Sequence, residues 1–153
     1  MEVITTQTNA DFDTYASMVA AKKLYPEACL VFSGSVEKRL RETLPGLPLF
    51  NEVLRIKDID ISNITRLILV DCRQSSRIGP FSEVAGRPGM DIHIYDHHPN
   101  AGNDIRGSVE EIRPYGSTTT VLTRIIREKG IKLAPEEATL LMAGIYEDTG
   151  SLS

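Results

Sequence analysis

The sequence predicts a single α/β domain, residues 1–153, built on a mostly parallel β-sheet with helices on its faces. Two observations favour this class. Short apolar runs alternate along the chain with longer segments of helical periodicity, which is the pattern of strand–helix–strand units. One run, residues 67–70 (LILV), is apolar at every position, as expected of a strand buried on both faces of a parallel sheet.

In chain order, strands are expected at residues 3–6, 29–32, 67–70 and 92–95, with a weaker extended run at 53–56. Helices are expected at 12–25, which Pro26 ends, at 36–44, which Pro45 ends, and at 117–129, which Gly130 caps. A last helix is expected at 135–147, with Pro135 at its favourable first position. The expected buried stripes are Phe12, Ala16, Val19 and Ala20 in the first helix, and Ala138, Leu141, Met142 and Ile145 in the last.

Composition excludes several classes of protein. The chain has 17 Lys and Arg against 21 Asp and Glu, a net charge of −4, so as a whole it does not attract nucleic acid non-specifically. Its two cysteines are too few for a disulfide scaffold and lack the spacing of a zinc site. The N-terminus has no signal-peptide features and no apolar run has the length of a membrane span, so we expect a cytoplasmic protein without membrane contact.

Acids and histidines follow the apolar runs and the last helix. They are Asp11, Asp13, Asp71, Asp96, His97, His98 and Asp148. Ligands of parallel α/β sheets bind beyond the carboxyl ends of the strands, so these side chains are expected to converge there. Clustered carboxylates repel one another unless a positive charge lies between them. Carboxylate oxygen with imidazole nitrogen and no thiolate cluster suits Mn²⁺ or Mg²⁺, and such a set can hold two ions for phosphoryl transfer.

Most of these residues also have an ordinary structural interpretation. Asp11 is a suitable N-cap for the first helix, with Asp13 complementing the helix dipole. Asp71 could be a loop acid, and the two histidines a solvated turn. Asp148 is harder to explain in this way. A carboxylate at a helix C-terminus is disfavoured by about 0.3–1 kcal/mol, a cost that a bound cation would reverse.

Smaller signals near these residues are open to two interpretations. Arg73 and Arg77 follow Asp71 and either face a substrate phosphate or are solvated. Ser117 and Thr118 open a helix and either bind an anion or simply cap it. Cys72 is expected to be a small buried residue rather than a ligand.

The motifs at residues 9–13 (NADFD), at Asp71, at 96–98 (DHH) and at 147–150 (EDTG) resemble, in order, the four motifs of the DHH phosphoesterases. That superfamily includes RecJ-type exonucleases, oligoribonucleases, exopolyphosphatases and manganese-dependent inorganic pyrophosphatases. The runs ITTQTNADFDTYASMVAAKKLYP, RIKDIDISNITRLILVDCRQSSRIG and IHIYDHHP are most similar to the N-terminal DHH unit of large bacterial proteins. In those proteins CBS domains and a tRNA nucleotidyltransferase/poly(A) polymerase domain follow.

The resemblance implies a role for each residue. Asp11 would bind a first Mn²⁺ or Mg²⁺ ion, and Asp71 would bridge it to a second ion held by Asp13, His97 and Asp148. His98 would contact the phosphate of a nucleotide or RNA end, as a charge stabiliser or acid. Asp96 would orient the histidines.

Two features depart from the family pattern. Family members usually have a histidine four residues before Asp11, where this chain has Gln7, and an amide oxygen is a much weaker ligand. The sequence also stops at Ser153, before the companion domain that grips substrate in the family. We therefore expect a weakened first metal site and little or no hydrolysis by the chain alone. The alternative is a non-catalytic module that binds nucleotide or metal and regulates an attached nucleotidyltransferase.

Overall fold

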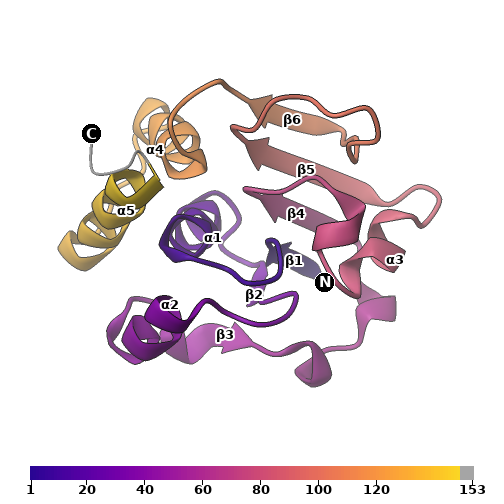
Figure 1. The fold of residues 1–153 in the computed structure, drawn as a ribbon, viewed down its shortest axis with the longest axis horizontal. Helices are drawn as coiled ribbons and strands as arrows, with labels where there is room; N and C mark the ends of the chain where they lie inside the picture. Colours follow the sequence, from indigo (N-terminus) through magenta and orange to yellow (C-terminus); the bar gives the residue numbers. More distant parts are fainter. Residues whose placement is uncertain (149–153) are drawn as a thin grey trace.

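The computed structural model describes residues 1–148, with side chains described through Glu147. Its centre is one six-stranded sheet in which all neighbouring strands are parallel, in the order β3-β2-β1-β4-β5-β6 (Figure 1). The strands are β1 (Glu2–Thr5), β2 (Cys29–Val31), β3 (Val53–Leu54), β4 (Arg66–Val70), β5 (Asp91–Asp96) and β6 (Val109–Ile112). The helices are α1 (Phe12–Leu24), α2 (Lys38–Thr43), α3 (Phe81–Ala85), α4 (Thr118–Glu128) and α5 (Pro135–Asp148). The α/β class with a parallel sheet is confirmed.

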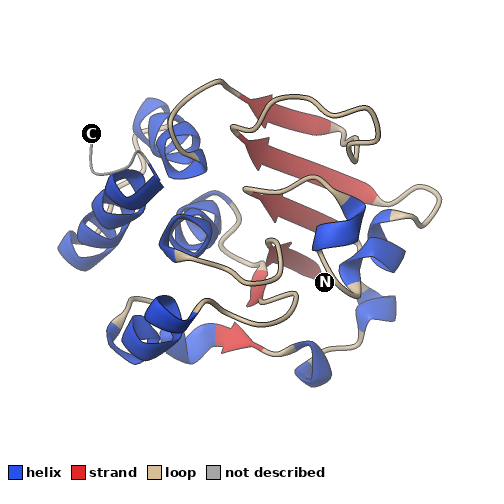
Figure 2. Ribbon diagram, in the orientation of Figure 1, coloured by secondary structure: helices blue, strands red, loops and turns tan. Residues whose placement is uncertain are grey.

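Successive strand residues face opposite sides of the sheet and form two separate cores. On β4, Ile68 and Val70 join the core shared with α1, α4 and α5, whereas Leu67 and Leu69 join the core shared with α3. Figure 2 shows the three longer helices on one side of the sheet and α3 on the other. Burial on both faces explains why residues 67–70 of this strand are all apolar.

The helix α1 is more deeply buried than its periodicity predicts. Every residue from 13 to 21 is buried, so the expectation of one apolar face is too narrow. The sheet covers one side of α1, and α4 and α5 pack against the other (Figure 1). This burial comes from helices that lie far along the sequence, so local periodicity does not reveal it.

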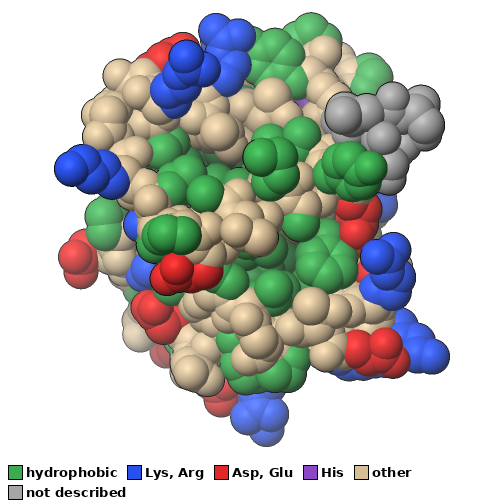
Figure 3. Space-filling view, turned by 90° about the vertical axis from the view of Figure 1, so that its left-hand side faces the viewer, with side chains coloured by type: hydrophobic (Ala, Val, Ile, Leu, Met, Phe, Trp, Pro, Cys, Tyr) green, Lys and Arg blue, Asp and Glu red, His purple; other side chains and the backbone are tan. Residues whose placement is uncertain are grey.

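The predicted buried stripe of α5 is partly wrong. Ala138 is exposed, and so is Met142, at 69%. The residues of α5 that are buried are Leu140, Leu141 and Gly144. A Cβ added at Gly144 would lie 2.6 Å from the Cβ of Ala16, so the glycine lets α5 approach α1 closely and rotates Met142 outward. Apolar side chains are visible on the face of the molecule that Figure 3 shows.

The strand order creates a switch point between β1 and β4. From β1 the chain moves outward to β2 and β3, and from β4 it moves the other way to β5 and β6. Doubly wound sheets bind ligands in the crevice beyond such a pair of strands. Asp71 directly follows β4 at this crevice, and Asp13 stands in the first turn of α1, the helix that follows β1. Among the residues described, no helix combines the length and apolar character needed to cross a membrane.

Candidate metal centre

Asp71 turns the chain at the end of β4. Its N–H still donates to the carbonyl of Tyr95 on β5 at 2.9 Å, but its own φ is +62°. Among residues other than glycine, Asp and Asn adopt this left-handed conformation most readily. The side chain is buried, and its Oδ1 accepts a hydrogen bond from Thr118 Oγ1 at 2.8 Å. The turn therefore directs a buried carboxylate into the crevice.

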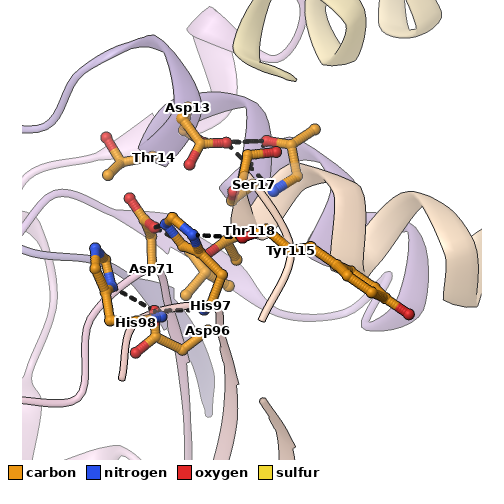
Figure 4. A network of polar contacts seen from close by, with 12 residues as sticks. Asp13, Thr14, Ser17, Asp71, Asp96, His97, His98, Tyr115 and Thr118 are labelled. Carbon is orange, nitrogen blue, oxygen red and sulfur yellow. Dashed lines mark hydrogen bonds and ion pairs between the residues drawn. The ribbon is translucent and has the colours of Figure 1, made fainter. Parts of the chain in front are cut away.

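His97, just beyond β5, faces that carboxylate. Its Nδ1 lies 3.0 Å from the carbonyl oxygen of Tyr115, which can only accept, so Nδ1 carries the hydrogen. Its Nε2 lies 3.3 Å from Asp71 Oδ1 (Figure 4). In the neutral ring Nε2 then presents a lone pair to an electron-rich oxygen, a contact that is favourable only with a shared proton or metal ion. Histidines that bind metals commonly donate their other N–H to a carbonyl in this way.

Asp96 orients both histidines. Its Oδ1 accepts from the backbone N–H of His97 at 2.8 Å and lies 2.7 Å from His98 Nδ1. Burial alone would raise the pKa of Asp96, but the hydrogen bond and charge of His98 and the backbone N–H groups outweigh it, so this pKa is lowered. The hydrogen bond to Asp96 raises the pKa of His98, although burial opposes it.

Together these residues fit a divalent ion. Asp71, His97 and His98 each offer a ligand atom, and these atoms all lie within 4.8 Å of one another. One carboxylate and two imidazoles match the oxygen and nitrogen ligands expected for such an ion. The neighbouring Cys72 is buried, as expected, and burial raises the pKa of its thiol. Its sulfur therefore stays protonated and is a poor ligand.

The N-terminus of α4 contacts two acids. Asp13 Oδ1 accepts from the backbone N–H of Thr119 at 3.2 Å and from its hydroxyl at 2.5 Å. The preceding residue, Thr118, donates to Asp71. Ser117 accepts from the N–H of Thr120 at 3.1 Å and caps the helix, so the capping interpretation of this segment is confirmed. The positive end of the helix dipole thus faces both carboxylates.

The remaining predicted ligands lie outside the cluster of Asp71, His97 and His98, or outside the side chains that the structure describes. The carboxylate of Asp11 accepts from the N–H of Thr14 at 3.0 Å in a capping box at the start of α1. Among the side chains described, neither Asp11 nor Asp13 belongs to the three-residue cluster. Gln7 lies half-buried in the loop between β1 and α1. The side chain of Asp148 lies outside the described residues.

The end of α5 nevertheless reaches the Asp11 loop. Burial, and then the negative charge of Asp11, raise the pKa of Glu147, while the N–H of Phe12 donates to it. The last turn of α5 therefore lies against the start of α1. Asp148 is the next residue along the chain.

A pocket of about 220 Å³ opens beside the cluster, and His98 and Arg77 are among the residues that line it. Arg77 is exposed, so it is open both to solvent and to a phosphate, and the two interpretations of this residue stay open. Arg73 is only 5% exposed, and its Nε pairs with Asp96 Oδ2 at 3.1 Å. Arg73 is therefore not solvated, and that expectation is wrong, although Arg73 does lie in the wall of the same pocket.

The sequence did not reveal every residue that shapes this site. The run of hydroxyl residues at 117–120 is a signal for Thr118 and Thr119, but from the sequence it predicts only a helix cap or an anion site, and not contacts to Asp71 and Asp13. No local pattern indicates that the carbonyl of Tyr115 holds His97, because a backbone contact 18 residues away depends only on the fold.

A family model described as "DHH family, N-terminal domain" matches residues 2–145. The chain is 57% identical over 158 residues to an A-adding tRNA nucleotidyltransferase of Geobacter sulfurreducens, covering 100% of this chain and 18% of the relative. It is 31% identical over 153 residues to the A-adding tRNA nucleotidyltransferase of Aquifex aeolicus, covering 99% and 17%. The chain therefore spans less than a fifth of the length of these two relatives.

Two further similarities are more distant. Over 58 residues the chain is 34% identical to a Staphylococcus aureus protein named "Probable manganese-dependent inorganic pyrophosphatase", covering 37% of this chain and 19% of the relative. Its fold is similar to that of an exopolyphosphatase-related protein from Bacteroides fragilis, with a TM-score of 0.80 at 20% identity, covering 99% and 47% of the two chains.

Proposed function

Because the chain belongs to the DHH family as its N-terminal domain, we propose that it is the metal-binding half of a phosphoesterase. It would bind Mn²⁺ or Mg²⁺ and act on a phosphoester of a nucleotide or RNA end. The observation that carries the proposal is the contact between His97 Nε2 and Asp71 Oδ1, which calls for a shared cation. The manganese-dependent relative supports the choice of ion.

Different residues of the chain would have different roles. Asp71 and His97 would hold the metal, with Asp13 and Asp148 as further proposed ligands. Bound divalent ions withdraw charge from phosphoryl oxygens and lower the pKa of water. His98, oriented by Asp96, would donate a hydrogen bond to a phosphate oxygen, and Arg77 on the pocket wall would balance its charge.

We further propose that residues 1–153 form one domain of a longer protein. A companion domain would complete the nucleotide or RNA site. The large share of the nucleotidyltransferase relatives that lies outside the aligned region supports this arrangement.

A second function is a non-catalytic module that binds nucleotide or metal and regulates an attached nucleotidyltransferase. Two observations favour it. Gln7 stands where the family usually has histidine, and the carboxylate of Asp11 is engaged as a helix cap. Both weaken the first of the two metal sites, and phosphoryl transfer by two ions needs both.

Metal binding is tested by titrating the chain with Mn²⁺ and comparing Asp71→Asn. Asparagine tolerates the left-handed backbone at this position, so the fold should persist while the charged ligand is lost. Affinity should fall by at least about tenfold, the smaller end of the losses seen around metal sites. Asp60→Asn, at an exposed helix cap, is the matched control. Unchanged affinity in Asp71→Asn would overturn the proposal.

Hydrolysis is tested in the full-length protein with Gln7 and with Gln7→His. Release of mononucleotide from a short RNA is measured with Mn²⁺, and pyrophosphate serves as the control substrate. Activity that rises with Gln7→His favours the enzyme. Metal or nucleotide binding without turnover in either protein favours the regulatory module.

A further inference from the structure

Arg73 is a buried cation between the two loops that form the site. It stands two residues beyond Asp71, and its side chain is 6% exposed. Its Nη2 donates to the carbonyl of His98 at 2.7 Å, and its Nη1 donates to Asn100 Oδ1 at 3.0 Å. The guanidinium therefore joins the loop after β4 to the turn after β5.

The two oxygens of Asp96 contact different partners, and Arg73 is one of them. Oδ2 pairs with Arg73 Nε at 3.1 Å, while Oδ1 lies 2.7 Å from His98 Nδ1. The contact at Oδ2 is an ion pair without hydrogen-bond geometry, and its charge favours the orientation of the carboxylate in which Oδ1 faces the imidazole. Asp96 is 1% exposed, so water does not compete for either oxygen.

We propose that Arg73 is a positioning residue that sets the orientation and tautomer of His98. By fixing Asp96 and the His98 carbonyl, it keeps the hydrogen on Nδ1 and leaves Nε2 to meet a metal ion or a phosphate. The inference deepens the proposed function and rests on it for the ligand, but the orientation of His98 does not depend on that ligand. A planar guanidinium can serve three acceptors at fixed angles, which an ammonium cannot.

Burial of a charged arginine needs compensation, and the structure provides it. Besides Asp96, Asp104 Oδ2 lies 3.5 Å from Arg73 Nε, and this carboxylate is 8% exposed. A purely structural role would be to hold the two loops together. In that case loss of Arg73 would lower stability and leave the His98 tautomer unchanged in any variant that still folds.

The tautomer is read from the ring ¹⁵N NMR shifts of the metal-free chain. The spectra are recorded at a pH well above the ordinary pKa of histidine, where the rings are neutral. The chain has only three histidines, and His93 is an internal reference because it lies earlier in β5, where its Nδ1 contacts the hydroxyl of Tyr25 rather than Asp96. The parent chain should show His98 protonated at Nδ1. Arg73→Met should move the hydrogen partly to Nε2 at His98 and leave His93 unchanged.

Two further variants keep the test decisive. Arg73→Lys retains the charge in case Arg73→Met does not fold, and it should give a partial shift of the tautomer. Asp104→Asn removes only the longer contact and should leave the tautomer as in the parent. A folded Arg73→Lys or Arg73→Met chain with the parent tautomer would overturn the inference.

Mn²⁺ affinity provides a second readout. Residues that orient metal ligands typically contribute roughly 10–100-fold to affinity, so Arg73→Met or Arg73→Lys should lose affinity toward that range, with Asp104→Asn close to the parent. If the parent chain binds no Mn²⁺, the proposed metal function fails while the NMR result still decides the role of Arg73. Parent-like affinity in both folded Arg73 variants would count against the role toward the metal.

Discussion

Two threonines of α4 differ in what their buried hydroxyls contact. Thr118 Oγ1 donates to Asp71 at 2.8 Å, whereas Thr123 Oγ1 is buried without a hydrogen-bond partner among the described residues. Valine keeps the branched shape, so Thr118→Val should lower the free energy of unfolding of the metal-free chain by about 1–3 kcal/mol, because a buried acceptor loses its donor. Thr123→Val should be neutral or stabilising. Urea unfolding measures both, and equal effects would contradict the role of Thr118.

The Asp96–His98 pair predicts a pH dependence of stability. The hydrogen bond to Asp96 raises the pKa of His98 in the folded state. A raised pKa stabilises the folded chain fully below the unfolded-state pKa, and this contribution is lost as the pH rises through the folded-state pKa. In metal-free buffer the free energy of unfolding should therefore fall from about the ordinary histidine pKa upward. His98→Gln should lack this part of the pH profile, and identical profiles would refute the assignment.

At the scale of elements, Gly144 controls the approach of α5. A Cβ there would meet Ala16 Cβ at 2.6 Å and Thr119 Oγ1 at 3.2 Å. Gly144→Ala should therefore destabilise the chain by about 1–3 kcal/mol through overpacking, although alanine favours helix by up to about 1 kcal/mol. It should also weaken Mn²⁺ binding, because Thr119 holds Asp13.

Gly46 provides the control for that variant. A Cβ at Gly46 meets nothing within 4 Å, so Gly46→Ala should leave stability unchanged or raise it slightly. Urea unfolding and Mn²⁺ titration of both variants test whether the close packing of α5 matters. A Gly144→Ala chain as stable as the parent would show that α5 has room to move.

Elements with strong local patterns were predictable, and those that depend on neighbours were not. The strand β4, apolar at residues 67–70, and the well-capped α4 lie close to where the sequence placed them. The edge strand β6 reads VEEI, a half-polar run that one neighbouring strand is enough to stabilise, so it gave no strand signal. The orientation of α5 follows from Gly144 packing on Ala16. Periodicity considers only the apolar side chains, so it does not reveal that the helix turns its glycine toward α1.

For the whole molecule, metal binding should raise stability by mass action. An ion that binds only the folded chain at a concentration of 100 times its dissociation constant adds about 2.7 kcal/mol to the free energy of unfolding. The parent chain should gain this much with Mn²⁺, measured by urea unfolding. Asp71→Asn should gain little at the same concentration. A similar gain in both chains would mean that the ion binds elsewhere.

The site was predictable in its location more than in its contacts. Acids placed after apolar runs pointed to one edge of a parallel sheet, and Asp71 and His97 do meet there. The sequence could not assign contacts made across the fold, such as the burial of Arg73 against Asp96. Asp11 illustrates the limit, because a residue next to a helix start can cap the helix or bind a metal, and here its carboxylate caps α1.

The contact between Asp13 and Thr119 has a consequence for folding kinetics. These residues are 106 positions apart, and between them the chain forms the five strands β2 to β6 on both sides of β1. Contacts of such long range form only after a large loop has closed, so this part of the fold is expected late on the folding pathway. Interactions absent from the transition state change the unfolding rate rather than the folding rate. A metal ion held at this crevice would therefore lengthen the lifetime of the folded chain without hastening its formation.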